Sequence, residues 1–172
     1  VTFTWDVAEG ERLADAWSCY YPTVRIGGPA YGDISTSFIP GYYIKRGITF
    51  TTRGCNNRCP WCLVPNREGK LTEITDFPAG HVVQDNNLLQ ASYSHLERVW
   101  RMLEGQRGVS FAGGLDARLI TAEIAERIRL LSTKYVYLAA DTSARLKPLA
   151  RAVELLAMPH YKVRVYTLIG FN

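Results

Sequence analysis

The sequence predicts an α/β protein built on a parallel sheet. Two observations favour this fold class: apolar, strand-like segments recur at a nearly fixed step, and segments with helical periodicity lie between them. The expected strands are Ile48–Thr52, His81–Asp85, Val109–Ala112, Tyr135–Ala140 and Val163–Ile169. From one strand start to the next the steps are 33, 28, 26 and 28 residues. Strands that alternate with helices in this way are typical of βαβ units.

Three helices are expected between the later strands, each with apolar residues three and four positions apart. They are Ser94–Leu103, the segment that follows Thr121, and Ala144–Ala157. Thr121 is a suitable N-cap, because its hydroxyl can accept a hydrogen bond from a backbone N–H of the first turn. Between the first two strands, Pro65 and Pro78 interrupt the pattern, so we expect part of that segment to be loop.

A nearly fixed βα step predicts a barrel or partial barrel, in which functional groups gather at the carboxyl ends of the strands. The first expected strand leads to Cys55, and an acid stands at or just after the end of each of the next three: Asp85, Asp116 and Asp141. One aspartate after a strand would be an ordinary helix N-cap. Three of them at the rim that carries Cys55 indicate a polar site.

The first 43 residues do not follow this pattern. Glu9–Trp17 is expected to form the end of a helix and Thr23–Ile26 a short strand, and a connection rich in Pro, Gly and Ser follows. We therefore expect residues 1–43 to be the tail of an upstream α/β, Rossmann-like domain with a linker, and residues 44–172 to form the barrel part. The chain begins without Met and stops soon after the fifth strand, so we read it as a fragment of a longer polypeptide.

The composition is that of an ordinary globular chain with one sizeable core: 172 residues, 47% hydrophobic and 21% charged. The net charge is only +4, and no run of Lys and Arg exceeds two residues, so nucleic acid is not indicated as a partner. No segment approaches the roughly 20 apolar residues of a membrane span, and no signal-peptide pattern opens the chain. We expect no membrane partner and a cytoplasmic location.

Three of the four cysteines lie in one octapeptide, Cys55-Asn56-Asn57-Arg58-Cys59-Pro60-Trp61-Cys62. Clustered cysteines indicate metal ligation in a reducing compartment. The spacing predicts a loop in which the three thiolates converge on a single point. Structural zinc sites normally have four protein ligands, and ordinary [4Fe–4S] clusters have four cysteines. The triplet therefore predicts a metal centre with one open coordination position. The alternative is a non-catalytic, zinc-stabilised α/β binding module, for which no fourth ligand is obvious.

This octapeptide resembles the signature of the radical S-adenosylmethionine (radical SAM) enzymes, Cys-x3-Cys-x-aromatic-Cys, with Trp61 in the aromatic position. The resemblance implies a [4Fe–4S] cluster bound by Cys55, Cys59 and Cys62, whose fourth iron binds SAM. It implies reductive cleavage of SAM to a 5′-deoxyadenosyl radical that abstracts hydrogen from a substrate, which stays unknown. It also implies an electron donor such as flavodoxin or ferredoxin.

The resemblance covers about residues 44–172 and is greatest to the branch in which a cobalamin-binding-type domain precedes the barrel. It implies a partial (βα)6, TIM-like barrel that is truncated here after strand five. Cobalamin is a possible cofactor of that branch, but the histidine motif that would bind cobalt is absent from this chain. Cobalamin is therefore not supported within the chain.

The resemblance also implies a set of SAM-binding positions. Asp85-Asn86-Asn87 stands where many members have Gly-Gly-Glu, and Gly170 lies in the segment that passes the adenine. Other readings stay open: Trp61 as a packing aromatic, and Asp116 as a helix cap or ion-pair partner. The implied positions are Trp61, Asp85, Asn86, Asn87, Asp116, Arg118, Asp141, Thr142 and Gly170. The remaining cysteine, Cys19, is expected to be an inert, buried thiol.

Overall fold

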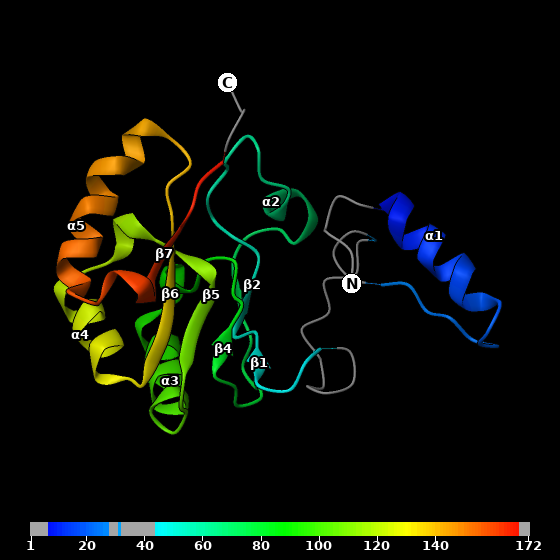
Figure 1. Ribbon diagram of the computed structural model, residues 1–172, viewed down its shortest axis with the longest axis horizontal. Coiled ribbons are helices and arrows are strands. Elements are labelled where there is room, and N and C mark those ends of the chain that lie inside the picture. Colours follow the sequence, from blue (N-terminus) through cyan, green and yellow to red (C-terminus); the bar gives the residue numbers. More distant parts are fainter. Residues whose placement is uncertain (1–6, 28–30, 32–43, 169–172) are drawn as a thin grey trace.

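A five-stranded parallel sheet organises this computed structural model, which describes residues 7–27, 31 and 44–168 (Figure 1). The strands lie in the order of the chain, and every neighbouring pair is parallel. They are β1 (Ile48–Thr49), β4 (Val82–Val83), β5 (Val109–Asp116), β6 (Thr133–Ala139) and β7 (Val163–Tyr166). The α/β fold class and the five expected strands are therefore confirmed.

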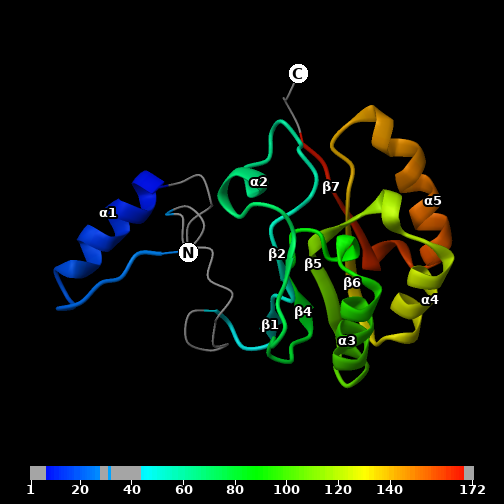
Figure 2. The same cartoon turned by 180° about the vertical axis from the view of Figure 1, so that it is seen from behind.

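The three expected helices are also confirmed: α3 (Tyr93–Glu104), α4 (Ala122–Leu130) and α5 (Leu146–Leu156). The hydroxyl of Thr121 accepts a hydrogen bond from the Ile124 N–H at 3.2 Å, which is the expected N-cap of α4. These helices lie against one side of the sheet, with α4 and α5 beside it in Figure 1 and α3 in front of it in Figure 2.

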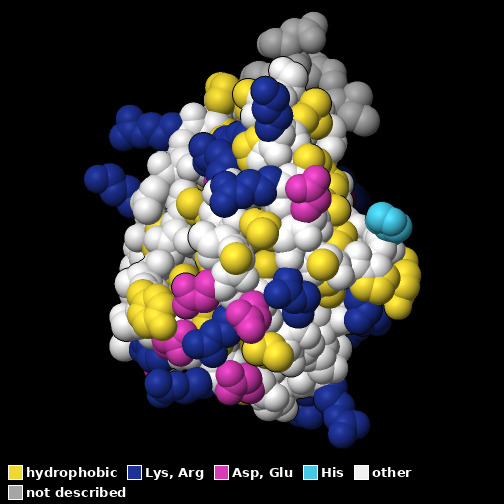
Figure 3. Space-filling model, turned by 90° about the vertical axis from the view of Figure 1, so that its left-hand side faces the viewer, with side chains coloured by type: hydrophobic (Ala, Val, Ile, Leu, Met, Phe, Trp, Pro, Cys, Tyr) yellow, Lys and Arg dark blue, Asp and Glu magenta, His cyan; other side chains and the backbone are white. Residues whose placement is uncertain are grey.

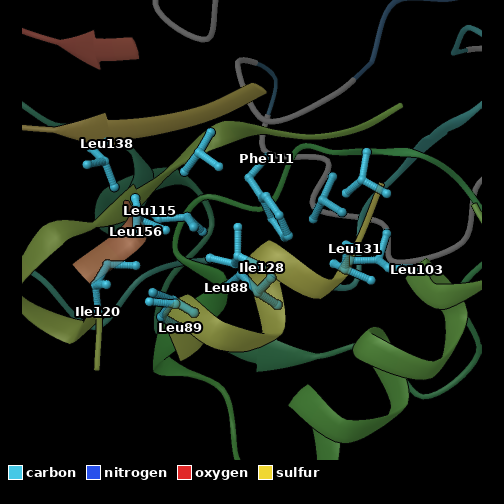
Figure 4. Packing of buried hydrophobic residues seen from close by; sticks show 14 of the residues in the cluster. Leu88, Leu89, Leu103, Phe111, Leu115, Ile120, Ile128, Leu131, Leu138 and Leu156 are labelled. Carbon is cyan, nitrogen blue, oxygen red and sulfur yellow. The ribbon is translucent and has the colours of Figure 1, made fainter. Parts of the chain in front are cut away.

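The hydrophobic core fills the space between the sheet and these helices (Figure 4). On β6, Val136 and Leu138 are fully buried toward the helices, whereas the alternate residues Tyr135 and Tyr137 stay partly exposed. This alternation is the period of two that a strand imposes on its side chains. Each fully buried aliphatic or aromatic side chain contributes about 1.5–3 kcal/mol relative to an exposed one. The core therefore holds the sheet and the helices together.

The sheet is open in the described part of the chain, with β1 and β7 at its edges. Barrel closure is not seen. The parallel order of strands is the arrangement that a βα repeat produces, but the sheet itself is an open, twisted layer of five strands.

The connection from β1 to β4 contains an antiparallel pair that the sequence did not predict. Strand β2 (Thr52–Arg53) pairs with β3 (Thr72–Glu73), and a four-residue helix, α2 (Val64–Arg67), lies between them. The first strand was expected to run through Thr52, but β1 ends at Thr49 and the chain then enters β2. The cysteines consequently lie in the loop of a hairpin.

The N-terminal segment forms the expected helix, α1 (Val7–Ser18), which has no buried residue (Figure 1). The expected strand Thr23–Ile26 is wrong: these residues are not part of a strand. A strand needs a neighbour for its backbone groups, and none of the described strands pairs with them. Cys19 is exposed, which corrects the expectation of a buried thiol. None of the helices in the described ranges is long and apolar enough to cross a membrane.

Candidate metal centre

The cysteine loop, residues 55–62, leaves the hairpin directly after β2. Gly54 introduces it with a φ of +74°, a left-handed conformation that favours glycine. A Cβ on Gly54 would lie 2.2 Å from the Lys70 carbonyl oxygen, so a side chain has no room there. The Cys55 N–H then donates to the Gly69 carbonyl at 3.2 Å. Backbone geometry therefore fixes where the first cysteine stands.

A buried glutamate ties the start of this loop to the segment after β4. One carboxylate oxygen of Glu68 accepts from the Gly54 N–H at 3.1 Å and from Asn86 Nδ2 at 2.7 Å. The Nε of Arg53 lies 3.3 Å from the same oxygen, as an ion pair without hydrogen-bond geometry. Asn86 thus contacts the hairpin rather than open space.

Gln90 and Asn87 hold the loop from the other side. The Gln90 Oε1 accepts from the Asn56 N–H at 2.9 Å, and its Nε2 donates to Asn57 Oδ1 at 3.0 Å. The Cys55 sulfur lies 3.4 Å from the Asn57 N–H donor and 3.7 Å from the Asn87 Nδ2 donor. N–H groups directed at a sulfur stabilise a metal-bound thiolate. Asn87 is 4% exposed, and its Oδ1 is buried without a hydrogen bond.

The other two cysteines close a turn at the end of the loop, where the Cys62 N–H donates to the Cys59 carbonyl at 3.0 Å. Burial raises the pKa of the Cys62 thiol, whereas a hydrogen bond with the Val64 backbone lowers it. The charges of Cys59, Cys55 and Asp141 raise this pKa further. The three cysteines and Asp141 therefore act on one another electrostatically.

The expected convergence of the thiolates on one point is not seen. Among the described residues, no group of three or more His, Cys, Asp or Glu side chains is placed to hold a metal ion. Like charges on neighbouring thiolates repel one another, and this repulsion is a smaller cause than burial in the raised pKa of Cys62.

Asp116 stands at the carboxyl end of β5 and joins the rim to the cysteine loop. Its carboxylate accepts from Asn57 Nδ2 at 3.2 Å, from the Arg118 guanidinium at 2.6 Å and from the Arg145 guanidinium at 3.4 Å. Burial would raise the pKa of Asp116, but hydrogen bonds from Arg118 and Asn57 outweigh it and lower the pKa to about 2. Asp116 also caps the short helix at Ala117–Leu119. It is therefore an ionised ion-pair partner next to the loop.

Asp85 is buried at the end of β4, with its carboxylate directed at the segment that follows β1. The side chain accepts from the Thr51 N–H at 2.6 Å, from the Thr52 N–H at 3.1 Å and from the Thr51 hydroxyl. Burial raises its pKa to about 6, against these hydrogen bonds, which lower it. Asp85 thus joins the end of β4 to the segment after β1, and its carboxylate is engaged there.

The other predicted SAM-binding residues differ in their burial and in whether they contact the cysteine loop. Asp141 is partly buried and acts on Cys62, Thr142 beyond it is exposed, and Trp61 is partly exposed within the loop. Arg118 reaches the loop as well, since its guanidinium donates to Asn57 Oδ1 at 3.2 Å. Gly170 lies outside the described residues. The structure therefore brings Asn87, Asp116, Arg118 and Asp141 to the cysteine loop.

Sequence reasoning missed the residues that hold the loop in place, Glu68, Gln90 and Asn57. Their partners are 14 to 61 positions away along the chain, and no local spacing signals such contacts. Only for Asn57 did the sequence offer a signal of such a role, because Asn57 lies inside the cysteine motif.

Comparison with protein-family models, curated proteins and solved structures found no match to this chain.

Proposed function

We propose that the protein is a radical SAM enzyme that uses a [4Fe–4S] cluster to cleave SAM reductively, on a substrate that is unknown. One observation carries the proposal: a Cys-x3-Cys-x-aromatic-Cys loop stands beyond the carboxyl end of β1, and polar side chains that follow the next strands reach it. Functional groups gather at this end of parallel βα sheets.

The residues of the loop fit an iron–sulfur cluster. Three cysteines supply the soft thiolates that iron–sulfur chemistry prefers. Each would hold a different iron of the cluster, so the sulfurs need not meet at one point, as they would around a single ion. Two N–H donors already face the Cys55 sulfur, which is the type of second-shell contact that such ligands receive. We assign Cys55, Cys59 and Cys62 as the ligands.

The bound cofactor pair supplies a 5′-deoxyadenosyl radical, and the chain's own residues bind and orient the SAM that provides it. Asn87, with its unpaired buried Oδ1, is the best placed acceptor for the SAM ammonium. Arg118 is the cation that would receive the carboxylate. Asp141, Thr142, Trp61 and Gly170 are proposed to complete the site. Asp85 is proposed to support the site indirectly, because its hydrogen bonds hold the end of β4 against the segment after β1.

The remaining parts of the proposal concern the whole protein. The open sheet would be part of a (βα)6 partial barrel, with residues 1–43 as the tail of a preceding α/β domain. An electron donor such as flavodoxin or ferredoxin would supply the electron. Cobalamin has no support within this chain.

Anaerobic reconstitution with iron and sulfide tests the proposal on the full chain. We expect about four irons and four sulfides per chain, and dithionite-dependent release of 5′-deoxyadenosine from SAM. Cys59→Ala should reduce bound iron to less than about a tenth, since a cluster ligand is lost. The matched control is Cys19→Ala, which alters an exposed cysteine outside the loop and should retain the iron.

Two results would contradict the proposal. Iron retained by Cys59→Ala would exclude the ligand assignment. One zinc per chain without sulfide, in protein purified under argon, would support the alternative of a zinc-stabilised binding module.

A further inference from the structure

A cavity of about 290 Å³ opens beside the candidate metal centre, where the short helix after β5 packs on α5. Its walls are formed by Ala117, Arg118, Lys147, Pro148 and Arg151. Arg118 follows β5 directly, and Lys147 and Arg151 stand one turn apart on α5. The cavity is therefore assembled from two βα units at the carboxyl end of the sheet.

The cavity is strongly basic. Of its five lining residues three are cations. The carboxylate of Asp116, which precedes Ala117 in the chain, is 4% exposed and already paired with Arg118 and Arg145. In the described part of the chain, neither Lys147 nor Arg151 forms an ion pair. Figure 3 shows Lys and Arg side chains on the upper half of this face, and others on the lower half, where most of the acidic side chains lie.

Lys147 and Arg151 repel each other, since like charges four residues apart destabilise a helix, and a bound anion would relieve this repulsion. The Arg151 guanidinium and the Lys147 ammonium are groups that bind phosphate, the guanidinium through two parallel N–H bonds and the ammonium as a point charge. Ala117 and Pro148 add an apolar wall, which suits the organic part of a small ligand.

Arg118 connects the cavity with the cysteine loop. Arg118 is one of the residues that line the cavity, and its guanidinium donates to Oδ1 of Asn57 at 3.2 Å, in the loop between Cys55 and Cys59. A ligand anchored by its phosphate in the cavity would thus be held next to the loop.

We infer that this cavity binds the phosphate group of a phosphorylated small molecule, and that this molecule is the substrate. The assignment as substrate rests on the proposed function, whereas the binding of a phosphate does not. The cavity thereby narrows the unknown substrate to phosphate esters.

Equilibrium titration of the metal-free full chain tests the binding, at fixed ionic strength, with glycerol 3-phosphate, inorganic phosphate and glycerol as probes. We expect glycerol 3-phosphate to bind more tightly than inorganic phosphate, and glycerol not to bind. The double variant Lys147→Gln/Arg151→Gln should weaken the binding at least about tenfold, because two cations of the cavity are lost. Its melting temperature is measured alongside to show that it folds.

The matched control removes two positive charges elsewhere. Arg101→Gln/Arg107→Gln alters exposed arginines at the end of α3 and in the turn before β5, and it should change the affinity less than about twofold. Equal losses in both double variants would mean unspecific attraction and overturn the inference. So would the absence of binding at about 10 mM phosphate ester, or equal affinity for inorganic phosphate and the ester.

A nucleic acid is the other source of phosphate. If a short single-stranded oligonucleotide binds through Lys147 and Arg151 while glycerol 3-phosphate does not, the small-molecule assignment is wrong. Iron content separates this inference from the proposed function: a chain that binds the ester through this cavity but never assembles a cluster would exclude the enzyme and retain the phosphate site.

Discussion

Asp85 and Asp116 follow neighbouring strands of one sheet, and their surroundings shift their pKa values in opposite directions. Burial dominates at Asp85 and raises its pKa from 3.8 to about 6. At Asp116, burial is outweighed by hydrogen bonds from Arg118 and Asn57, and the pKa falls from 3.8 to about 2. The fold therefore favours the charged form of Asp116, which has a cation beside it, and the neutral form of Asp85, which has none among the causes of its pKa shift.

The raised pKa of Asp85 predicts that Asp85→Asn stabilises the protein at neutral pH. The folded chain keeps a proton that the unfolded chain releases, so this contribution to stability is complete below pH 3.8 and is lost as the pH rises to about 6. An asparagine removes the buried charge, and its Oδ1 can still accept from the Thr51 and Thr52 N–H groups. We expect a gain on the order of 2 kcal/mol above pH 6, measured by urea unfolding between pH 3 and 8.

Asp116→Asn is the contrasting control, with the opposite sign. The lowered pKa of Asp116 stabilises the fold above about pH 4, and this contribution is lost as the pH falls toward 2. The asparagine leaves Arg118 and Arg145 without their carboxylate, so a loss of about 1–3 kcal/mol is expected at pH 7. If Asp85→Asn instead destabilises the protein at pH 7, the prediction for Asp85 is wrong, and the hydrogen bonds from Thr51 and Thr52 require a charged carboxylate.

At the scale of elements, a bulge in β5 shapes the site. Phe111 pairs with Val136 and Leu115 with Leu138, so the three residues 112–114 of β5 lie opposite one residue of β6. Gly114 has a φ of +89°, which favours glycine, and Gly113 packs against the backbone of Asp85. The bulge lets the ends of β4 and β5 approach closely, and it places Asp116 beside the cysteine loop.

Gly113→Ala should destabilise the protein because its Cβ would lie 2.0 Å from the Asp85 carbonyl oxygen, a backbone atom that cannot rotate away. We expect a loss of roughly 2–4 kcal/mol in the free energy of unfolding. Gly105→Ala is the matched control: its φ is −81°, and the nearest atom to a new Cβ is the Met102 oxygen at 3.8 Å. The control should change stability by less than about 1 kcal/mol, and similar losses in both variants would contradict the argument from close packing.

The elements that could be predicted from the sequence are those with strong periodicity. The buried strands β5 and β6 and the helices α3 and α5 each carry a run long enough to show a period of two or of 3.6. The pair β2 and β3 has two residues in each strand, too few to show any period. The segment Thr23–Ile26 has the composition of a strand, but composition does not provide the neighbouring strand that it would need.

At the scale of the whole molecule, the sequence could place side chains at the sheet edge but could not determine their contacts. The fixed step of the βα repeat placed Asp85, Asp116 and Asp141 after neighbouring strands. Whether each carboxylate faces the cysteine loop depends on partners distant in the sequence, such as Thr51 for Asp85 and Asn57 for Asp116. A repeat predicts positions along the chain, and packing decides their direction.

The distribution of the core predicts that residues 1–43 contribute little to stability. The buried hydrophobic residues of the described ranges run from Ile74 to Leu156, and α1 has none. A chain that begins at residue 44 should therefore unfold within about 1 kcal/mol of the full chain, as measured by urea unfolding with circular dichroism. Leu156→Ala, which empties a fully buried position on α5, is the control that shows the assay's sensitivity, with an expected loss of about 2–5 kcal/mol. A truncated chain that loses as much as this variant would show that the N-terminal segment packs on the sheet, and the boundary at residue 43 would be wrong.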